Sequence, residues 1–201
     1  DGVHDMMNDY KSLAVQYLVG TVQISQPASP NPVTFDSPAS EVMTDLRKIS
    51  AAVIAPNTPM EIANTYMMQR GVRTLLVINE DNSLAGIITA TDILGEKPLR
   101  FIQDRRVKHH EILVMDIMTP LEKLEAISLD EVEHARVGNI VSSLRESERL
   151  HALVIDDNTI GLPRICGIFS WTQIEKQLGT VIPPNNVAKS FAEIESTLIA
   201  S

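Results

Sequence analysis

Thr89 and Asp92 are the residues of this sequence best suited to bind a small polar ligand. They stand three positions apart at the end of the stretch GIITATD, residues 86–92. A carboxylate such as Asp92 can accept two hydrogen bonds, and charge-assisted bonds of this kind contribute about 1.5 to 3 kcal/mol each. The pattern places both residues where a strand gives way to a helix, and such a junction presents backbone N–H groups and a helix dipole to an anion. Both residues are therefore candidates for polar contacts with a small ligand.

The unit that contains these residues occurs twice in the chain. The first copy ends in GIITATD, and the second ends in GIFSWTQ at residues 167–173. Each copy opens with a Met-Thr pair and runs through a helix-like segment into a short apolar strand. Repetition of this kind marks each copy as one supersecondary unit. Two similar halves imply a cleft between them.

The elements that must position Thr89 and Asp92 follow from local patterns in the first copy. Asn57, Thr58 and Pro59 are residue types that begin helices, and Gly71 can end a helix in the left-handed conformation. The sequence NEDNS is a turn signal between two β-rich runs. The predicted elements are strands at 49–54, 72–78 and 84–89, a helix at 60–70 and a second helix that begins at 91–94.

Composition and charge exclude several classes of protein. The chain has 201 residues, of which 44% are apolar, enough for one compact domain or two small ones. No uninterrupted apolar run reaches about 18 residues, so no membrane span is predicted. The net charge of -9 repels phosphate backbones and argues against a dedicated nucleic-acid binder.

The single cysteine, Cys166, bears on chemistry and compartment. One cysteine excludes disulfides within the chain and thiolate metal cages, and we expect Cys166 to be a small buried residue. Because no signal peptide is recognisable, a cytoplasmic location is expected. Whether the sequence is a piece of a longer protein stays open.

The remaining segments offer no second site. Residues 1–25 are predicted as a helix, and residues 26–40 carry four prolines and cannot form a regular helix. The basic stretch at 100–110 is predicted as a solvated linker helix. Its adjacent histidines point about 100° apart on a helix, so no metal site is expected. In the tail, residues 187–199 are predicted as an amphipathic helix.

Six short motifs carry a family resemblance. In the first copy they are VMT (42–44), NTP (57–59), RGVRTLLVINED (70–81) and GIITATD, and in the second they are IMTP (117–120) and GIFS (167–170). The chain resembles paired cystathionine β-synthase (CBS) domains, the β-α-β-β-α repeats that associate head to tail as a Bateman module. The resemblance implies an α/β fold. The predicted organisation is an N-terminal helix and proline-rich extension at 1–40, CBS repeats at 41–98 and 114–178, a linker at 99–113 and a tail at 179–201.

The resemblance implies an adenosine-containing ligand, such as AMP, ADP, ATP or S-adenosylmethionine, bound between the repeats. It implies that Asp92 accepts hydrogen bonds from the ribose hydroxyls, with Thr89 beside the same sugar or phosphate. It further implies that Arg73 reaches phosphate and that the strand around Ala52 and Ile54 contacts adenine. The candidate ligand-binding residues are Thr89, Asp92, Arg73, Ala52, Ile54, Gly86, Ser170, Gln173 and His151.

The second copy departs from this pattern. Gln173 stands at the acidic position and Leu150 at the position of the first copy's arginine, so a second site is in doubt. Ser170 keeps the hydroxyl, and Arg149 and His151 are nearby candidates for phosphate.

Each candidate also has a purely structural interpretation. Gly86 can serve only close strand packing, Thr89 can be an ordinary strand residue, and Asp92 can be a helix N-terminal residue stabilised by the dipole. Arg73 can be an exposed arginine after a helix. Trp171, the only tryptophan, is expected to pack at an interface rather than to stack on a base.

The leading function is a non-catalytic ligand sensor, a homodimer that passes a conformational change to a regulated partner. The alternative is a structural or dimerisation module whose ligand site has decayed. An enzyme is not expected, because the sequence has no GxSxG, HExxH or phosphate-binding loop motif and no cysteine paired with histidine. No catalytic residue, catalytic cofactor or metal is predicted.

Overall fold

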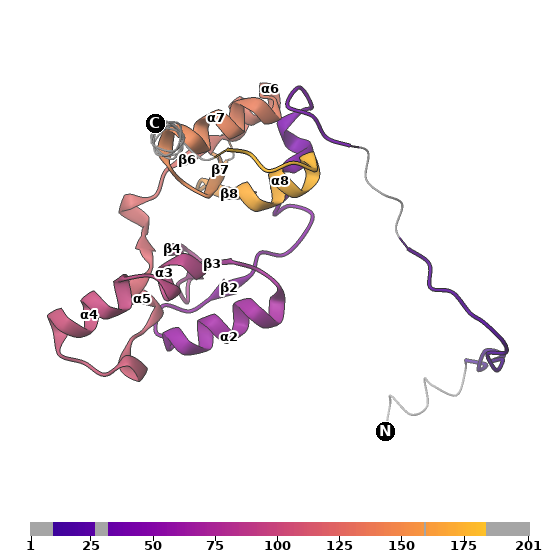
Figure 1. Cartoon of the computed structure of the whole chain (residues 1–201), viewed down its shortest axis with the longest axis horizontal. Coiled ribbons are helices and arrows are strands. Elements are labelled where there is room, and N and C mark those ends of the chain that lie inside the picture. The colour runs from indigo at the N-terminus through magenta and orange to yellow at the C-terminus, as the bar shows by residue number, and fades with distance from the viewer. Residues whose placement is uncertain (1–9, 27–31, 159, 184–201) are drawn as a thin grey trace, which may run out of the picture. The chain divides into compact units, whose positions relative to one another are not determined.

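A computed structural model describes residues 10–26, 32–158 and 160–183 of the chain (Figure 1). The chain divides into two compact units, residues 1–31 and residues 32–201. Both sequence copies lie in the second unit, and the predicted tail helix at 187–199 lies outside the described residues.

The predicted N-terminal helix is wrong over the part that the structure describes. Residues 10–26 contain no helix, and their apolar side chains are exposed, with Val15 96% and Tyr17 97% accessible. A helix of this length gains most of its stability from packing an apolar face, and this segment packs none. Gly20 also takes a positive φ of 74°, which interrupts any helical run.

The second unit is built on two four-stranded sheets, and most of their strands are labelled in Figure 1. The first sheet has the order β2 (Val53–Ile54), β3 (Thr74–Ile78), β4 (Leu84–Thr89) and β5 (Thr119–Pro120). The second has the order β1 (Thr44–Asp45), β8 (Arg164–Ser170), β7 (His151–Asp156) and β6 (Ala126–Ser128).

The two sequence copies exchange their opening strands. β1 opens the first copy but pairs with β8 of the second, and β5 opens the second copy but pairs with β4 of the first. Two glycines allow this close approach. A Cβ at Gly86 would clash with the backbone oxygen of Thr119, and a Cβ at Gly167 would clash with the sulfur of Met43. Gly86 therefore serves close strand packing, which was the structural interpretation of this residue beside its possible role in ligand binding.

The helices of the first copy follow the prediction closely. α2 (Met60–Arg70) begins after Pro59 and ends at Gly71, which takes the left-handed conformation with φ 64°. α3 (Ala90–Leu94) follows β4 directly. The predicted strand at 49–54 is shorter, since only β2 pairs, in parallel, with β3.

The linker is helical over only part of the predicted stretch. α4 (Lys97–Arg105) ends at Arg106, which has φ 54°, and a 3-10 helix, η2 (His109–Glu111), leads to α5 (Val114–Ile117). In the second copy two helices, α6 (Leu129–His134) and α7 (Val137–Ser147), precede β7, and α8 (Trp171–Leu178) follows β8. The remaining 3-10 helices are η1 (Ala39–Val42) and η3 (Leu121–Lys123).

Three apolar clusters hold the second unit together. One is centred on the first copy, around Leu75 and Ile88, and also takes in Ile112, Val114 and Ile117. Another is centred on the second copy and also takes in Val33, Ala39 and Val42. It includes the buried side chains of Cys166, as expected, and of Trp171, for which an interface was expected. The third joins the two sheets through Leu76, Ile87 and Leu153. The copies therefore share a buried core, and no described helix is long and apolar enough to cross a membrane.

Candidate functional site

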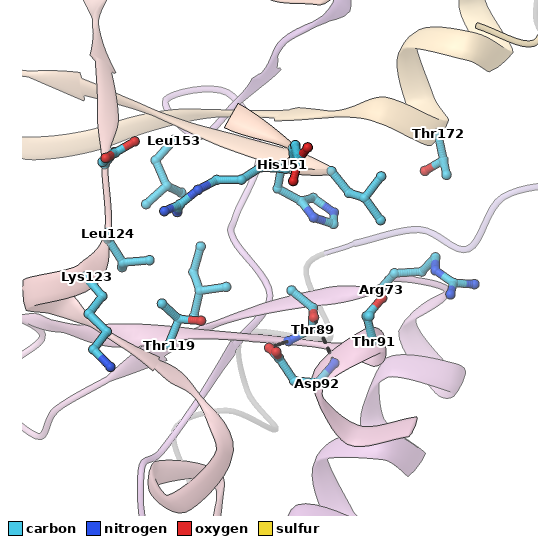
Figure 2. A pocket seen from close by; sticks show the side chains of 15 residues that line it. Arg73, Thr89, Thr91, Asp92, Thr119, Lys123, Leu124, His151, Leu153 and Thr172 are labelled. Atoms are coloured by element: carbon cyan, nitrogen blue, oxygen red, sulfur yellow. Dashed lines mark hydrogen bonds between the residues drawn. The ribbon is translucent and has the colours of Figure 1, made fainter. Parts of the chain in front are cut away.

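A cleft of about 470 Å³ lies between the two copies, and we call it the main cleft (Figure 2). In Figure 2, Thr89, Asp92 and Arg73 extend from the first copy toward the space that His151 and Leu153 face from the second. The lining residues are Arg73, Ile87, Thr89, Thr91 and Asp92 of the first copy and Thr119, Lys123, Leu124, Glu125, Glu148, Arg149, Leu150, His151, Leu153 and Thr172 of the second.

Thr89 and Asp92 form a reciprocal cap at the start of α3. The backbone N–H of Thr89 donates to Asp92 Oδ2 at 2.9 Å, and the backbone N–H of Asp92 donates to Thr89 Oγ1 at 3.2 Å. This capping box fixes both side chains against the end of β4. It also occupies the N–H groups that were expected to face an anion, and α3 is only five residues long. Attraction for a phosphate must therefore come from side chains.

Lys97 is a neighbour of Asp92 that the sequence pattern did not single out. Its Nζ lies 2.7 Å from Asp92 Oδ1 and 3.3 Å from the carbonyl oxygen of Ile117. The Asp92 side chain is 14% exposed and that of Lys97 is 49% exposed. The only trace of this contact in the sequence was a lysine five positions after the aspartate. Because a short helix ends between the two residues, helical periodicity does not predict that they meet.

Cationic side chains line the main cleft on both copies. Arg73 comes from the segment before β3, Lys123 from η3 and Arg149 from the segment before β7. Among the residues that the structure describes, none of these three is paired with a carboxylate. Two carboxylates, Glu125 and Glu148, also line the cleft. The described residues thus offer a bound anion three cations that form no ion pair among them, with two carboxylates in the same cleft.

His151 joins the two copies at the edge of the cleft. Its Nε2 lies 2.7 Å from Thr74 Oγ1, and the two residues hold equivalent positions at the starts of β7 and β3. Burial lowers the pKa of His151, the charge of Arg73 lowers it further, and the carboxylate of Asp92 acts in the opposite direction. The imidazole is therefore biased toward its neutral form.

The structure brings four of the predicted site residues into the main cleft: Arg73, Thr89, Asp92 and His151. Gly86 lies outside it, against β5. Ala52 packs against the first copy's core, and Ile54 lines a separate cavity of about 640 Å³ beside α2. Ile54 thus lines a different cavity from Asp92, and Ala52 is not among the residues of the main cleft. β2 is the edge strand on the far side of β3 from β4, which leads to Asp92.

The remaining two candidates lie on the second copy, away from the main cleft. Ser170 caps α8, where its Oγ accepts the backbone N–H of Gln173 at 3.5 Å. Gln173 lines another cavity, of about 610 Å³, together with residues of β1 and with Arg47. Arg47 is held by both carboxylate oxygens of Asp45, at 2.9 and 3.0 Å. This cavity is the counterpart of the main cleft under exchange of the two copies.

The linker histidines do not form a metal site in the described part of the chain. His109 Nδ1 lies 3.1 Å from Glu61 Oε1 in an exposed pair. No group of three or more histidine, cysteine, aspartate or glutamate side chains there could hold a metal ion.

Comparison with known proteins agrees with this architecture. The family model "CBS domain" matches residues 29–98. No curated protein matches the sequence. The match covers the first copy, whose motifs carry the resemblance to CBS domains.

Solved structures match both copies. An uncharacterised conserved protein from Pyrococcus horikoshii is 23% identical, with a TM-score of 0.53 over 72% of this chain and 93% of that one. CBSX2 of Arabidopsis thaliana, in a structure with AMP, is 19% identical, with a TM-score of 0.51 over 70% and 94%. The CBS-domain protein ATU1752 of Agrobacterium tumefaciens is 14% identical, with a TM-score of 0.51 over 76% and 98%. The fold is that of a tandem pair of CBS domains.

Proposed function

We propose that this chain, which has the fold of a tandem CBS pair, is a non-catalytic regulatory module that binds an adenosine nucleotide in its main cleft. The observation that carries the proposal is the meeting of Asp92 and Thr89 with Arg73, Lys123 and Arg149 in one cavity. Its volume of about 470 Å³ lies in the range of small-molecule sites. A nucleotide has hydroxyl groups, phosphate and an apolar ring, and the lining of this cleft has residues that can bind each of the three.

Each part of a nucleotide has residues of matching chemistry. Asp92 accepts a hydrogen bond at each carboxylate oxygen, and each oxygen keeps a lone pair for a ribose hydroxyl. The three cations are suited to phosphate oxygens. Apolar side chains that can cover an adenine ring are Ile87, Leu124, Leu150 and Leu153. The cations favour AMP, ADP or ATP over S-adenosylmethionine, whose sulfonium is positively charged.

The AMP in the CBSX2 structure supports including AMP among the nucleotides to be tested. Because the two chains are 19% identical, that structure supports the fold, and the residues of the main cleft support the ligand.

A ligand in this cleft can act on the angle between the two copies. It would touch residues of both, next to the bond between Thr74 and His151. A shape change follows only if the ligand binds one arrangement of the copies more tightly than the other. We propose that the change is passed to a protein partner and that the module works as a homodimer in the cytoplasm. Exposed apolar side chains on α2, Ile62 at 56% and Met68 at 69%, support a further contact surface.

Calorimetric titration with AMP, ADP, ATP and S-adenosylmethionine tests the proposal. We expect micromolar binding of at least one nucleotide and a loss of about tenfold or more in Asp92→Asn, because a charge-assisted acceptor is removed. Asp104→Asn is the matched control, since it removes the same charge from an exposed position on α4 outside the cleft.

Two results would contradict the proposal. Absence of heat with all four compounds would favour the structural or dimerisation module, an alternative that the uncharged Gln173 and Leu150 of the second copy also favour. Binding that survives Asp92→Asn unchanged would place the ligand outside the main cleft.

A further inference from the structure

Lys97 contacts the key carboxylate of the main cleft without lining the cleft itself. It belongs to α4 and is not among the lining residues, yet its Nζ lies 2.7 Å from Asp92 Oδ1. A second bond, 3.3 Å to the carbonyl oxygen of Ile117, ties the same ammonium group to the end of α5. With Thr89 N–H on Oδ2, the carboxylate is fixed at both oxygens. Lys97 therefore sets both the orientation and the charge of this corner of the cleft.

The second copy shows what happens where the carboxylate is missing. Aligning GIITATDILGEK with GIFSWTQIEKQL places Gln173 at the position of Asp92 and Leu178 at the position of Lys97. Leu178 packs against the apolar core of its copy. Both charges are thus absent together, so the corner is formally neutral in each copy, by an ion pair in one and by uncharged residues in the other.

We propose that Lys97 is a positioning residue that neutralises Asp92 and thereby makes the main cleft selective for anionic over cationic adenosine ligands. This inference rests on the proposed nucleotide function. With Asp92 compensated, the three cations Arg73, Lys123 and Arg149 outnumber the two other carboxylates of the lining, Glu125 and Glu148. Without Lys97, the bare carboxylate repels phosphate and attracts a sulfonium, while it still accepts hydrogen bonds from ribose.

The experiment compares three ligands that differ in charge: ATP, neutral adenosine and S-adenosylmethionine. In Lys97→Met we expect ATP affinity to fall by about fivefold and S-adenosylmethionine affinity to rise by a similar factor, as for one partly exposed charge. Adenosine affinity should change little. Lys97→Arg should restore the wild-type order, because it returns the cation.

Arg100→Gln is the matched control. It removes one positive charge from the same helix, where Arg100 pairs with Glu96 at 2.8 Å, outside the main cleft. We expect its ratio of ATP to S-adenosylmethionine affinity to equal that of the wild type.

The possible failures are distinguishable. If the wild type binds none of the three ligands and neither AMP nor ADP, the proposed function and this inference fall together. If it binds ATP but Lys97→Met leaves the affinity ratio unchanged, only the inference is overturned. Equal weakening of all three ligands would also overturn it, because Lys97 would then support the shape of the site and not its charge selectivity.

Discussion

At the scale of single residues, charge and burial decide what the cleft can bind. The spacing of Thr89 and Asp92 already predicted a polar site at a strand-to-helix junction. The structure adds that both are tied into a capping box and that Lys97 compensates the carboxylate. No sequence pattern predicted the ion pair between Asp92 and Lys97, because the contact depends on the direction of α4 after α3.

His151 gives a residue-level prediction about pH. Because its pKa in the folded protein lies below the ordinary value of 6.5, the unfolded chain binds more proton at this position when the pH is near or below 6.5. The contribution of neutral His151 to the free energy of unfolding is therefore fully present above that pH, and it is lost as the pH falls. Between about pH 7 and about pH 5 the wild type should lose more free energy of unfolding than His151→Gln, as measured by urea denaturation.

The control for this pH effect is His110→Gln, which replaces an exposed histidine of the linker. Its loss of stability between the two pH values should match that of the wild type. A His151→Gln variant with the full wild-type loss would show that His151 does not couple folding to protonation.

At the scale of elements, the two glycines at the exchanged strands make a paired prediction. A methyl group at Gly86 meets the backbone of Thr119, whereas one at Gly167 meets the flexible side chain of Met43. Gly86→Ala should therefore cost about 1 to 3 kcal/mol of unfolding free energy, and Gly167→Ala should cost clearly less. Chemical denaturation of the two variants measures the difference, and equal costs would contradict the exchanged pairing.

The local elements of the first copy were predictable because their signals are local. α2 begins and ends at the predicted residues, since Pro59 and Gly71 act on the backbone beside them. The N-terminal helix was not predictable in this way. A segment with a mixed apolar pattern, such as residues 10–25, forms a stable helix only if its apolar face packs against something, and in the structure these side chains are exposed.

At the scale of the whole molecule, the exchanged strands and the shared cluster of Leu76, Ile87 and Leu153 predict one cooperative unfolding transition for the two copies. Trp171, the only tryptophan, reports on the second copy by fluorescence, while circular dichroism reports on the helices of both. The two signals should change at the same denaturant concentration. Separate midpoints would show that the copies unfold independently.

Through the resemblance of its motifs to CBS domains, the sequence determined the fold. By itself it determined the repeat, the helices of the first copy and the strand-to-helix junction that carries Thr89 and Asp92. These follow from residue type and short spacing, which act on neighbouring backbone. Only the tertiary structure decided which cleft each residue lines. Because β2 is the edge strand on the far side of β3, Ile54 lines a different cavity from Asp92, while Lys123 and Arg149 of the second copy line the main cleft with Asp92. Contacts between segments far apart in the chain depend on packing, and packing leaves no periodic trace in the sequence.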